Sequence, residues 1–107
     1  MGQTVISEDE RFEWDEAKDV FNKNEHGLHF YEILPAFDDP YLLEFYDETH
    51  STLEETRFKG LAEVHDFIIL YLSYTEKASG RTRIISARLA VPVEEEMYYE
   101  WRKNFIT

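Results

Sequence analysis

The sequence predicts an α+β fold: a single small domain of order β-α-α-β-β-β-β-α, with a mostly antiparallel sheet and helices packed on it. Three observations lead to this class. Strand-like segments follow one another after Pro40, and their short links favour antiparallel neighbours. The 107 residues are enough for one small core. Apolar residues make up 43% of the chain, too large a share for a disordered protein.

The first forty residues predict one strand and two helical segments. RFEWD at 11–15 alternates large apolar with acidic residues, as a half-buried strand does. Asp15 stands where an N-cap would and Gly27 where a helix would close, so we expect a helix between them. The residues at helical spacing within it are Ala17, Val20, Phe21 and Asn24. A second apolar helical segment covers residues 28–37, and Pro35 should shorten or bend it.

The remaining chain predicts four strands and a last helix. The strand segments are 41–48, 56–64, 66–76 and 81–91. FIILYL at 67–72 is apolar on both faces, so its strand should be central and covered by helix, and it is far too short to span a bilayer. Pro92 and the glutamates after it suit the first turn of a helix. Its apolar stripe is predicted to be Val93, Met97, Trp101 and Phe105.

The N-terminal segment and the amino-acid composition exclude several classes of protein and of functional site. Residues 1–10 are expected to be an N-terminal tail that need not be ordered, and residues 11–107 the domain. The N-terminus has no apolar run of the kind that signal peptides contain, so we expect a soluble, cytoplasmic protein. The chain has no cysteine, which excludes disulfides, thiolate zinc sites and a cysteine nucleophile.

Positive charge is scarce and concentrated. The formal net charge is −12, and residues 1–55 alone hold sixteen acidic and three basic residues. Six of the eleven basic residues fall between positions 57 and 88: Arg57, Lys59, Lys77, Arg81, Arg83 and Arg88. Bulk electrostatics would repel nucleic acid, so an anion-binding site must be local and must lie in this segment.

The arginines of RTRIISARLAV, at 81–91, are the strongest candidates for such a site. Strict alternation puts Arg83 and Arg88 on opposite faces, so a bulge or strand end near Ser86–Ala87 is needed to unite them. Arg57 and Lys59 share a face on the preceding strand. Arginine suits phosphate because its fork of donors is rigid and always charged. Alternatively, these arginines pair with the abundant carboxylates and serve only solubility.

Histidines and tyrosines supply further candidates. His50, in a loop before the Arg57 strand, could act as a general acid or base or could cap a turn. His26 and His29 are three residues apart, but Gly27 breaks their helix and no further ligand lies at metal-site spacing, so no metal is expected. One of Tyr98 and Tyr99 could stack on a base, or both could pack in the core.

Taken in order, several motifs resemble the BrnT family of type II toxins, from about Phe12 to Tyr99. They are FEWDEAK, Asn-x3-His-Gly, FDDPY, HS followed by E-x-R-F, YTE and R-x-R-I-I-S-A-R. Each motif is weak alone, whereas RIISAR with FEWD and HG in register is specific. The resemblance implies a RelE-like fold and a ribonuclease that arrests growth. It also implies a BrnA antitoxin of ribbon-helix-helix type, through which alone the pair contacts DNA and represses its operon.

The resemblance also gives the candidate residues roles. RelE-like cleavage needs no metal or cofactor, because the ribose 2′-hydroxyl attacks the adjacent phosphate. By position, Arg57, Arg83 and Arg88 would contact phosphate and stabilise the transition state, and His50 would transfer protons. The RNA-binding candidates are Lys59, Arg81, His26 and Tyr99.

The chain departs from the family pattern at two of these motifs. Glu25 stands where the family carries a basic residue, and Leu89 where it carries lysine. Two other hypotheses therefore stay open. One is a BrnT-like protein that has lost catalysis but still binds an antitoxin and represses transcription. The other is an acidic interaction module that mimics nucleic acid and shares only the fold.

Overall fold

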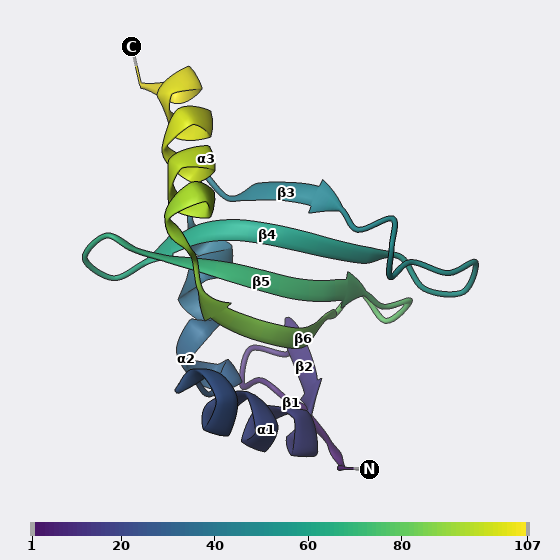
Figure 1. The fold of residues 1–107 in the computed structure, drawn as a ribbon. Helices are drawn as coiled ribbons and strands as arrows, with labels where there is room; N and C mark the ends of the chain where they lie inside the picture. Colours follow the sequence, from purple (N-terminus) through teal and green to yellow (C-terminus); the bar gives the residue numbers. More distant parts are fainter. Residues whose placement is uncertain (1, 107) are drawn as a thin grey trace.

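The structure, a computed structural model, describes residues 2–106 and contains one six-stranded sheet and three α-helices (Figure 1). The strands are β1 (Thr4–Ile6), β2 (Phe12–Asp15), β3 (Leu43–Tyr46), β4 (Arg57–Val64), β5 (Ile68–Glu76) and β6 (Thr82–Leu89). The helices are α1 (Glu16–His26), α2 (Phe30–Ile33) and α3 (Pro92–Arg102), with 3-10 helices η1 (Leu34–Asp38) and η2 (Lys103–Phe105). The predicted α+β class is confirmed.

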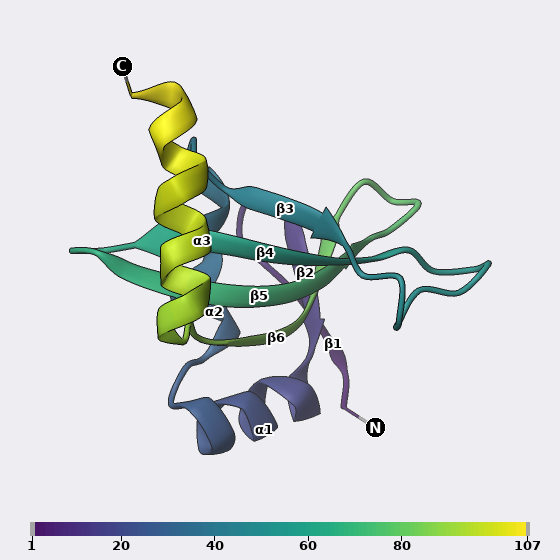
Figure 2. The ribbon, with the colours of Figure 1, turned by 45° about the horizontal axis from the view of Figure 1, so that its top comes forward.

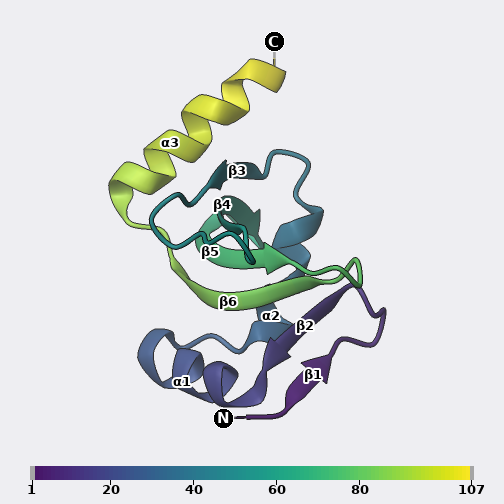
Figure 3. The ribbon, with the colours of Figure 1, turned by 90° about the vertical axis from the view of Figure 1, so that its right-hand side faces the viewer.

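The strand order is β1-β2-β6-β5-β4-β3, and every neighbouring pair is antiparallel except β2 and β6, which run parallel. On one face α2 lies against the sheet (Figure 3). Phe30 and Ile33 of α2 belong to the same buried cluster, the main core, as Leu72, Tyr74 and Ile84 of the sheet. On the opposite face α3 crosses β4 and β5 near one end (Figure 2). The molecule is therefore layered, with the main core between one sheet face and α2 and η1, and with α3 over one end of the other face.

The predicted helix ends are confirmed by their geometry. The Asp15 side chain accepts a hydrogen bond from the backbone N–H of Lys18, and Gly27 adopts φ +76°, the left-handed conformation that glycine tolerates. Pro92 is the first residue of α3, and the Glu94 carboxylate accepts from the N–H of Val91 at 2.9 Å. The second helical segment is bent as expected, because α2 ends at Ile33 and continues as a 3-10 helix.

The predicted strands are confirmed, each beginning one or two residues later than expected, and β5 is central as its apolar sequence indicates. One strand was not predicted. Thr4–Ile6, within the segment expected to be a tail, form β1 on the outer edge of β2. Val5 lies opposite Trp14 and packs against the main core, so β1 contributes apolar cover that three residues could not signal by periodicity. Met1 and Thr107, which the predicted tail and domain include, lie outside the described residues.

The apolar stripes of the first and last helices are not their buried sides. On α1, Val20 and Phe21 are 52% and 64% exposed, whereas Asn22 is buried. The Asn22 amide is satisfied there, because it donates to the carbonyls of Leu28 and Ala87 and accepts from the Ala87 N–H.

On α3, Val93 is 62% exposed and Met97 46%, whereas Tyr98 is buried and donates to Asp39 at 2.6 Å. Hydrogen bonds to the sheet and to the loop before it therefore decide how both helices are turned. None of the helices within residues 2–106 is long and apolar enough to cross a membrane.

Candidate phosphate-binding site on the sheet

A bulge in β6 brings the arginines of this strand to one face. Ser73 of β5 lies opposite Ser86, but the next residue, Tyr74, lies opposite Ile84, so Ile85 is left over. One extra residue inverts the alternation of side chains along the bulged strand. Arg83 and Arg88 therefore lie on the same face, which is the arrangement that a shared phosphate site on this strand needs.

The strand register then defines three rows of side chains across this face, since directly opposed residues of antiparallel strands point to the same side. The first row is Arg57, Thr75 and Arg83; the second is Lys59, Ser73 and Ser86; the third is Leu61, Tyr71 and Arg88. We call these nine residues the basic face. α3 packs over the third row, where Tyr98 contacts the cluster that holds Leu61 and Tyr71. α3 crosses the sheet near the end where β4 finishes and β5 begins (Figure 2), whereas the other two rows lie towards the start of β4.

Each basic side chain of this face has a carboxylate partner. Arg57 Nε donates to Glu55 Oε1 at 2.7 Å, and this bond lowers the pKa of the Glu55 carboxyl despite its partial burial. Lys59 Nζ lies 3.8 Å from Asp47 Oδ2 and donates to the Ser73 hydroxyl at 3.3 Å. The side chains of Arg57 and Lys59 are half-buried, at 28% and 20% exposed.

The two arginines of β6 are paired more tightly. Arg83 forms an ion pair with Glu13, which the parallel register places beside it on β2. Arg88 donates to both oxygens of Glu94, at 2.8 and 2.9 Å, in the two-pronged geometry with which arginine also binds phosphate. These hydrogen bonds lower the pKa of Glu94 and raise that of Arg88. The carboxylate pairing that was the alternative interpretation of these arginines is therefore present.

Tyr71 lies between two of the cations. The Arg88 guanidinium carbon is 4.2 Å from its ring centroid, and Lys59 Nζ is 5.2 Å from it. Burial and the charge of Glu94 raise the pKa of the Tyr71 hydroxyl, although Arg88 opposes this. Sequence reasoning missed this residue because it counted FIILYL as apolar throughout. The signal was the alternation Tyr71, Ser73, Thr75, which places polar groups on one face of β5.

His50 lies in the loop from β3 to β4 and is held by Asp47. Its Nδ1 is 2.8 Å from Asp47 Oδ2, and its backbone N–H donates to Oδ1 at 3.3 Å. Asp47 faces the first row, because its N–H donates to the Arg57 carbonyl. Sequence reasoning named His50 but missed Asp47, whose position three residues earlier was the available signal.

The other predicted RNA-binding residues are spread more widely. Arg81 precedes β6 and pairs with Glu10 at 3.5 Å. His26 is the exposed last residue of α1. Tyr99 packs edge-on against Tyr98 in the smaller core cluster. The basic face thus includes Arg57, Lys59, Arg83 and Arg88, with His50 beside it, and not Arg81, His26 or Tyr99.

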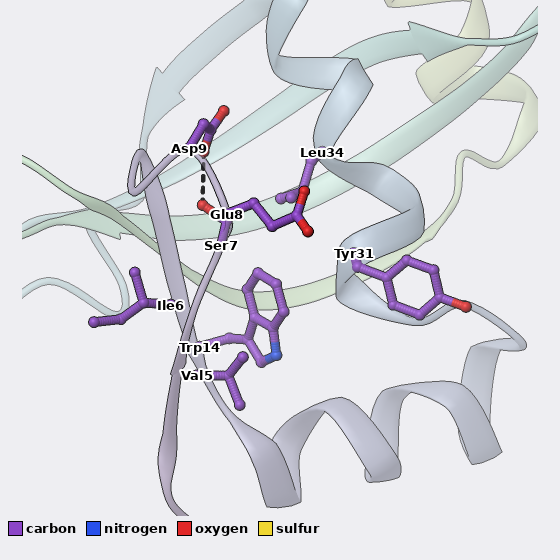
Figure 4. Close-up of a pocket in the computed structure, with 8 residues that line it drawn as sticks. All are labelled: Val5, Ile6, Ser7, Glu8, Asp9, Trp14, Tyr31 and Leu34. Atoms are coloured by element: carbon purple, nitrogen blue, oxygen red, sulfur yellow. Dashed lines mark hydrogen bonds between the residues drawn. The ribbon is translucent and has the colours of Figure 1, made fainter.

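Two further features of the molecule concern the binding of metals and ligands. In the described part of the chain, no group of three histidine, aspartate or glutamate side chains is arranged to hold a metal ion. A hollow of about 550 Å³ lies between β1 and α2, with Val5, Ile6, Trp14, Tyr31 and Leu34 around it (Figure 4). Glu8 and Asp9 are the charged residues in its lining, so this hollow does not suit a phosphate.

Comparisons with known proteins identify the family of the chain. The model of the family described as "Ribonuclease toxin, BrnT, of type II toxin-antitoxin system" matches residues 14–94. The crystal structure of the Brucella abortus ribonuclease toxin BrnT is 25% identical with a TM-score of 0.59, over 73% of this chain and 92% of that one. No curated protein matches. The resemblance in the motifs is thus confirmed, and the chain belongs to the BrnT family of ribonuclease toxins of type II toxin-antitoxin systems.

Proposed function

We propose that this chain is the toxin of a type II pair and an endoribonuclease that cleaves RNA without a metal ion, by attack of a ribose 2′-hydroxyl on the adjacent phosphate. Membership of the family implies an RNA substrate and an antitoxin partner. The observation that carries the proposal is the β6 bulge, which gathers Arg83 and Arg88 with Arg57 and Lys59 on one face. A plain solubility role would not require such an irregularity.

The proposed reaction requires three kinds of chemical group in the site. A base removes the proton of the 2′-hydroxyl, cations stabilise the charge that develops on the phosphorane, and an acid protonates the leaving 5′-oxygen. We assign contact with the RNA phosphates and charge stabilisation to Arg57, Arg83 and Arg88 as a group, and proton transfer to His50. Losing one stabilising donor of this kind typically costs about two to three orders of magnitude in rate.

The spacing of the rows divides these roles among neighbouring phosphates. The first and third rows are four residues apart along β5, or about 14 Å at the usual strand rise. This exceeds the span of one phosphate group, so Arg88 and the Arg57–Arg83 pair would contact different phosphates. Lys59 lies between them, and Tyr71 offers an aromatic face beside Arg88. We infer that the RNA chain runs along β5.

On RNA binding, phosphate oxygens would replace the carboxylates that now pair with these cations. A bidentate partner such as Glu94 occupies the same donors that a phosphate would use. We propose that the antitoxin is a BrnA-like protein of ribbon-helix-helix type, that the pair contacts DNA only through it, and that the toxin acts in the cytoplasm. The chain's charge of −12 favours a partner with basic segments.

The four ion pairs also favour a second candidate function. Glu13, Asp47, Glu55 and Glu94 neutralise the four cations of the basic face. Association with a polyanion depends on free positive charge. A catalytically inactive protein that binds its antitoxin and takes part in repression would keep the fold and accept this neutralisation.

Expression without an antitoxin separates the two candidates. The toxin should arrest growth and degrade total RNA, whereas normal growth with intact RNA at good expression would leave only the binding protein. Arg83→Ala and Arg88→Ala should each abolish cleavage while the fold persists. Lys103→Ala is the matched control, since it removes the same charge from the exposed end of the chain, where Lys103 pairs with Glu100. Cleavage by both arginine variants at the wild-type rate would show that the site lies elsewhere.

A further inference from the structure

We propose that Asp47 is a positioning residue, which holds the imidazole of His50 in one orientation and one tautomer for proton transfer. This inference rests on the proposed ribonuclease function. It adds a residue that neither the sequence motifs nor the family match assigns, and it concerns the acid–base part of the reaction and not the binding of phosphate.

Asp47 is itself firmly held. The residue is 8% exposed and follows directly after β3. Its N–H donates to the Arg57 carbonyl at 2.9 Å, and its own carbonyl accepts from the Ser51 hydroxyl at 2.7 Å and the Ser51 N–H at 3.1 Å. The Ser51 hydroxyl also accepts from the Arg57 N–H at 2.9 Å. The carboxylate is therefore carried by a loop that is bonded to the end of the sheet on both sides.

The two oxygens of Asp47 have different tasks. Oδ1 accepts the His50 backbone N–H at 3.3 Å, which is the ordinary bond of an aspartate that closes a turn. Oδ2 lies 2.8 Å from the His50 ring nitrogen Nδ1, a contact that the turn does not need. An ionised carboxylate only accepts hydrogen bonds, so Nδ1 must carry the proton. The neutral ring then presents an unprotonated Nε2, and the side chain is 58% exposed, so this nitrogen can reach a substrate hydroxyl.

The surroundings keep Asp47 charged. Burial raises the pKa of its carboxyl, but the hydrogen bonds from His50 and the charges of His50 and Lys59 outweigh burial and hold that pKa below its ordinary value. Lys59 Nζ lies 3.8 Å from the same Oδ2 that faces the ring. When Nε2 takes the proton of a 2′-hydroxyl, the imidazolium forms beside a carboxylate that is already ionised and oriented. Lys59 thus connects the acid–base pair to the basic face.

Asp47→Asn is the decisive variant because it preserves the turn and changes the ring's partner. The asparagine oxygen can still accept from the His50 N–H, while its amide donates towards the ring. Nδ1 must then accept, so the proton moves to Nε2 and the base is lost. The tautomer is read directly from two-bond ¹H–¹⁵N spectra of the ¹⁵N-labelled protein at about pH 9, well above the ordinary imidazole pKa of about 6.5. His50→Gln assigns the signal among the four histidines.

We expect the proton on Nδ1 in the wild type and on Nε2 in Asp47→Asn. A wild-type ring protonated on Nε2, or a tautomer unchanged by the substitution, would overturn the inference. This measurement does not depend on cleavage. If the wild type cuts no RNA, the proposed function fails, and the spectra still decide whether Asp47 orients the ring.

Steady-state cleavage kinetics supply the second readout. Asp47→Asn should lower kcat by about 10²- to 10⁴-fold, the usual range for losing a positioned acid or base, with KM little changed. It should cost nothing further in a His50→Gln background, because the two residues act as one unit. Asp38→Asn, an exposed carboxylate paired with Arg11, is the control. An equal loss in both backgrounds would mean that Asp47 serves only the fold.

Discussion

Glu94 is predicted to compete with RNA for Arg88, and Glu94→Gln should therefore strengthen RNA binding. The carboxylate holds both prongs of the Arg88 guanidinium at 2.8 and 2.9 Å. A phosphate that uses the same donors must first displace it. Glutamine keeps an oxygen for the N–H of Val91, so the start of α3 should survive the substitution.

The size of the effect follows from the exposure of the pair. A hydrogen bond between charged groups contributes about 1.5–3 kcal/mol when it is well shielded. The Arg88 side chain is 35% exposed and that of Glu94 15%, so solvent screens the pair, and we take about 1–2 kcal/mol for both bonds together. At about 1.4 kcal/mol per factor of ten, RNA affinity should rise about 5- to 30-fold. The free energy of unfolding should fall by a similar 1–2 kcal/mol at most.

The assay is fluorescence anisotropy with a short single-stranded RNA whose 2′-O-methyl groups prevent cleavage, at one fixed salt concentration. Glu96→Gln is the matched control, because it removes the same charge from an exposed position of the same helix. Any excess of Glu94→Gln over Glu96→Gln measures the local competition. Equal affinities for the two variants would refute the argument, as would a gain that persists in the Arg88→Ala background.

Three further changes test the packing and the pH dependence. Asn22→Ala leaves the buried N–H and carbonyl of Ala87 without their side-chain partners. Denaturant titration should therefore show the free energy of unfolding reduced by about 3 kcal/mol. A loss below about 1 kcal/mol would contradict the role of Asn22. Burial and the hydrogen bond to Asp39 raise the pKa of Tyr98 far above its ordinary 10.0. The stability that this tyrosine contributes below about pH 10 should therefore be lost as the pH rises. Thermal melts at pH 8–11 should show a less steep loss of stability in Tyr98→Phe than in the wild type. The hydrogen bonds from Arg88 lower the pKa of Glu94 below 4.5, so the stability that Glu94 contributes above that pH should be lost as the pH falls. Unfolding curves measured at pH 2–5 should therefore differ between the wild type and Glu94→Gln, and matching curves would contradict the prediction.

The elements with strong local signals were predictable. Asp15 and Gly27 mark the ends of α1 because capping and left-handed φ depend on the residue itself. The irregularity in β6 was also predictable, since only an extra residue can bring side chains of odd and even number to one face, and the structure places it at Ile85. β1 was missed because three residues carry too little periodicity, and its pairing with β2 alone reveals it.

The rotation of the helices about their own axes could not be predicted from the local sequence. Val20 and Val93 lie in apolar stripes at helical spacing and are nevertheless exposed. The buried residues are Asn22 and Tyr98, whose hydrogen-bond partners lie 65 and 59 residues away in sequence. Periodicity shows that a helix has an apolar side, but it does not show which side finds a partner.

The sequence by itself determined the fold class, the segment in which positive charge is concentrated and the family, because these depend on composition, periodicity and local motifs. Only the tertiary structure decided that Arg83 and Arg88 share a face with Arg57, that a carboxylate meets each of them, and that Asp47 faces the ring of His50. Ion pairs such as Arg83 with Glu13 join residues 70 positions apart. Such contacts follow from strand register and not from neighbouring letters, since pairing across a sheet brings distant residues within bonding distance.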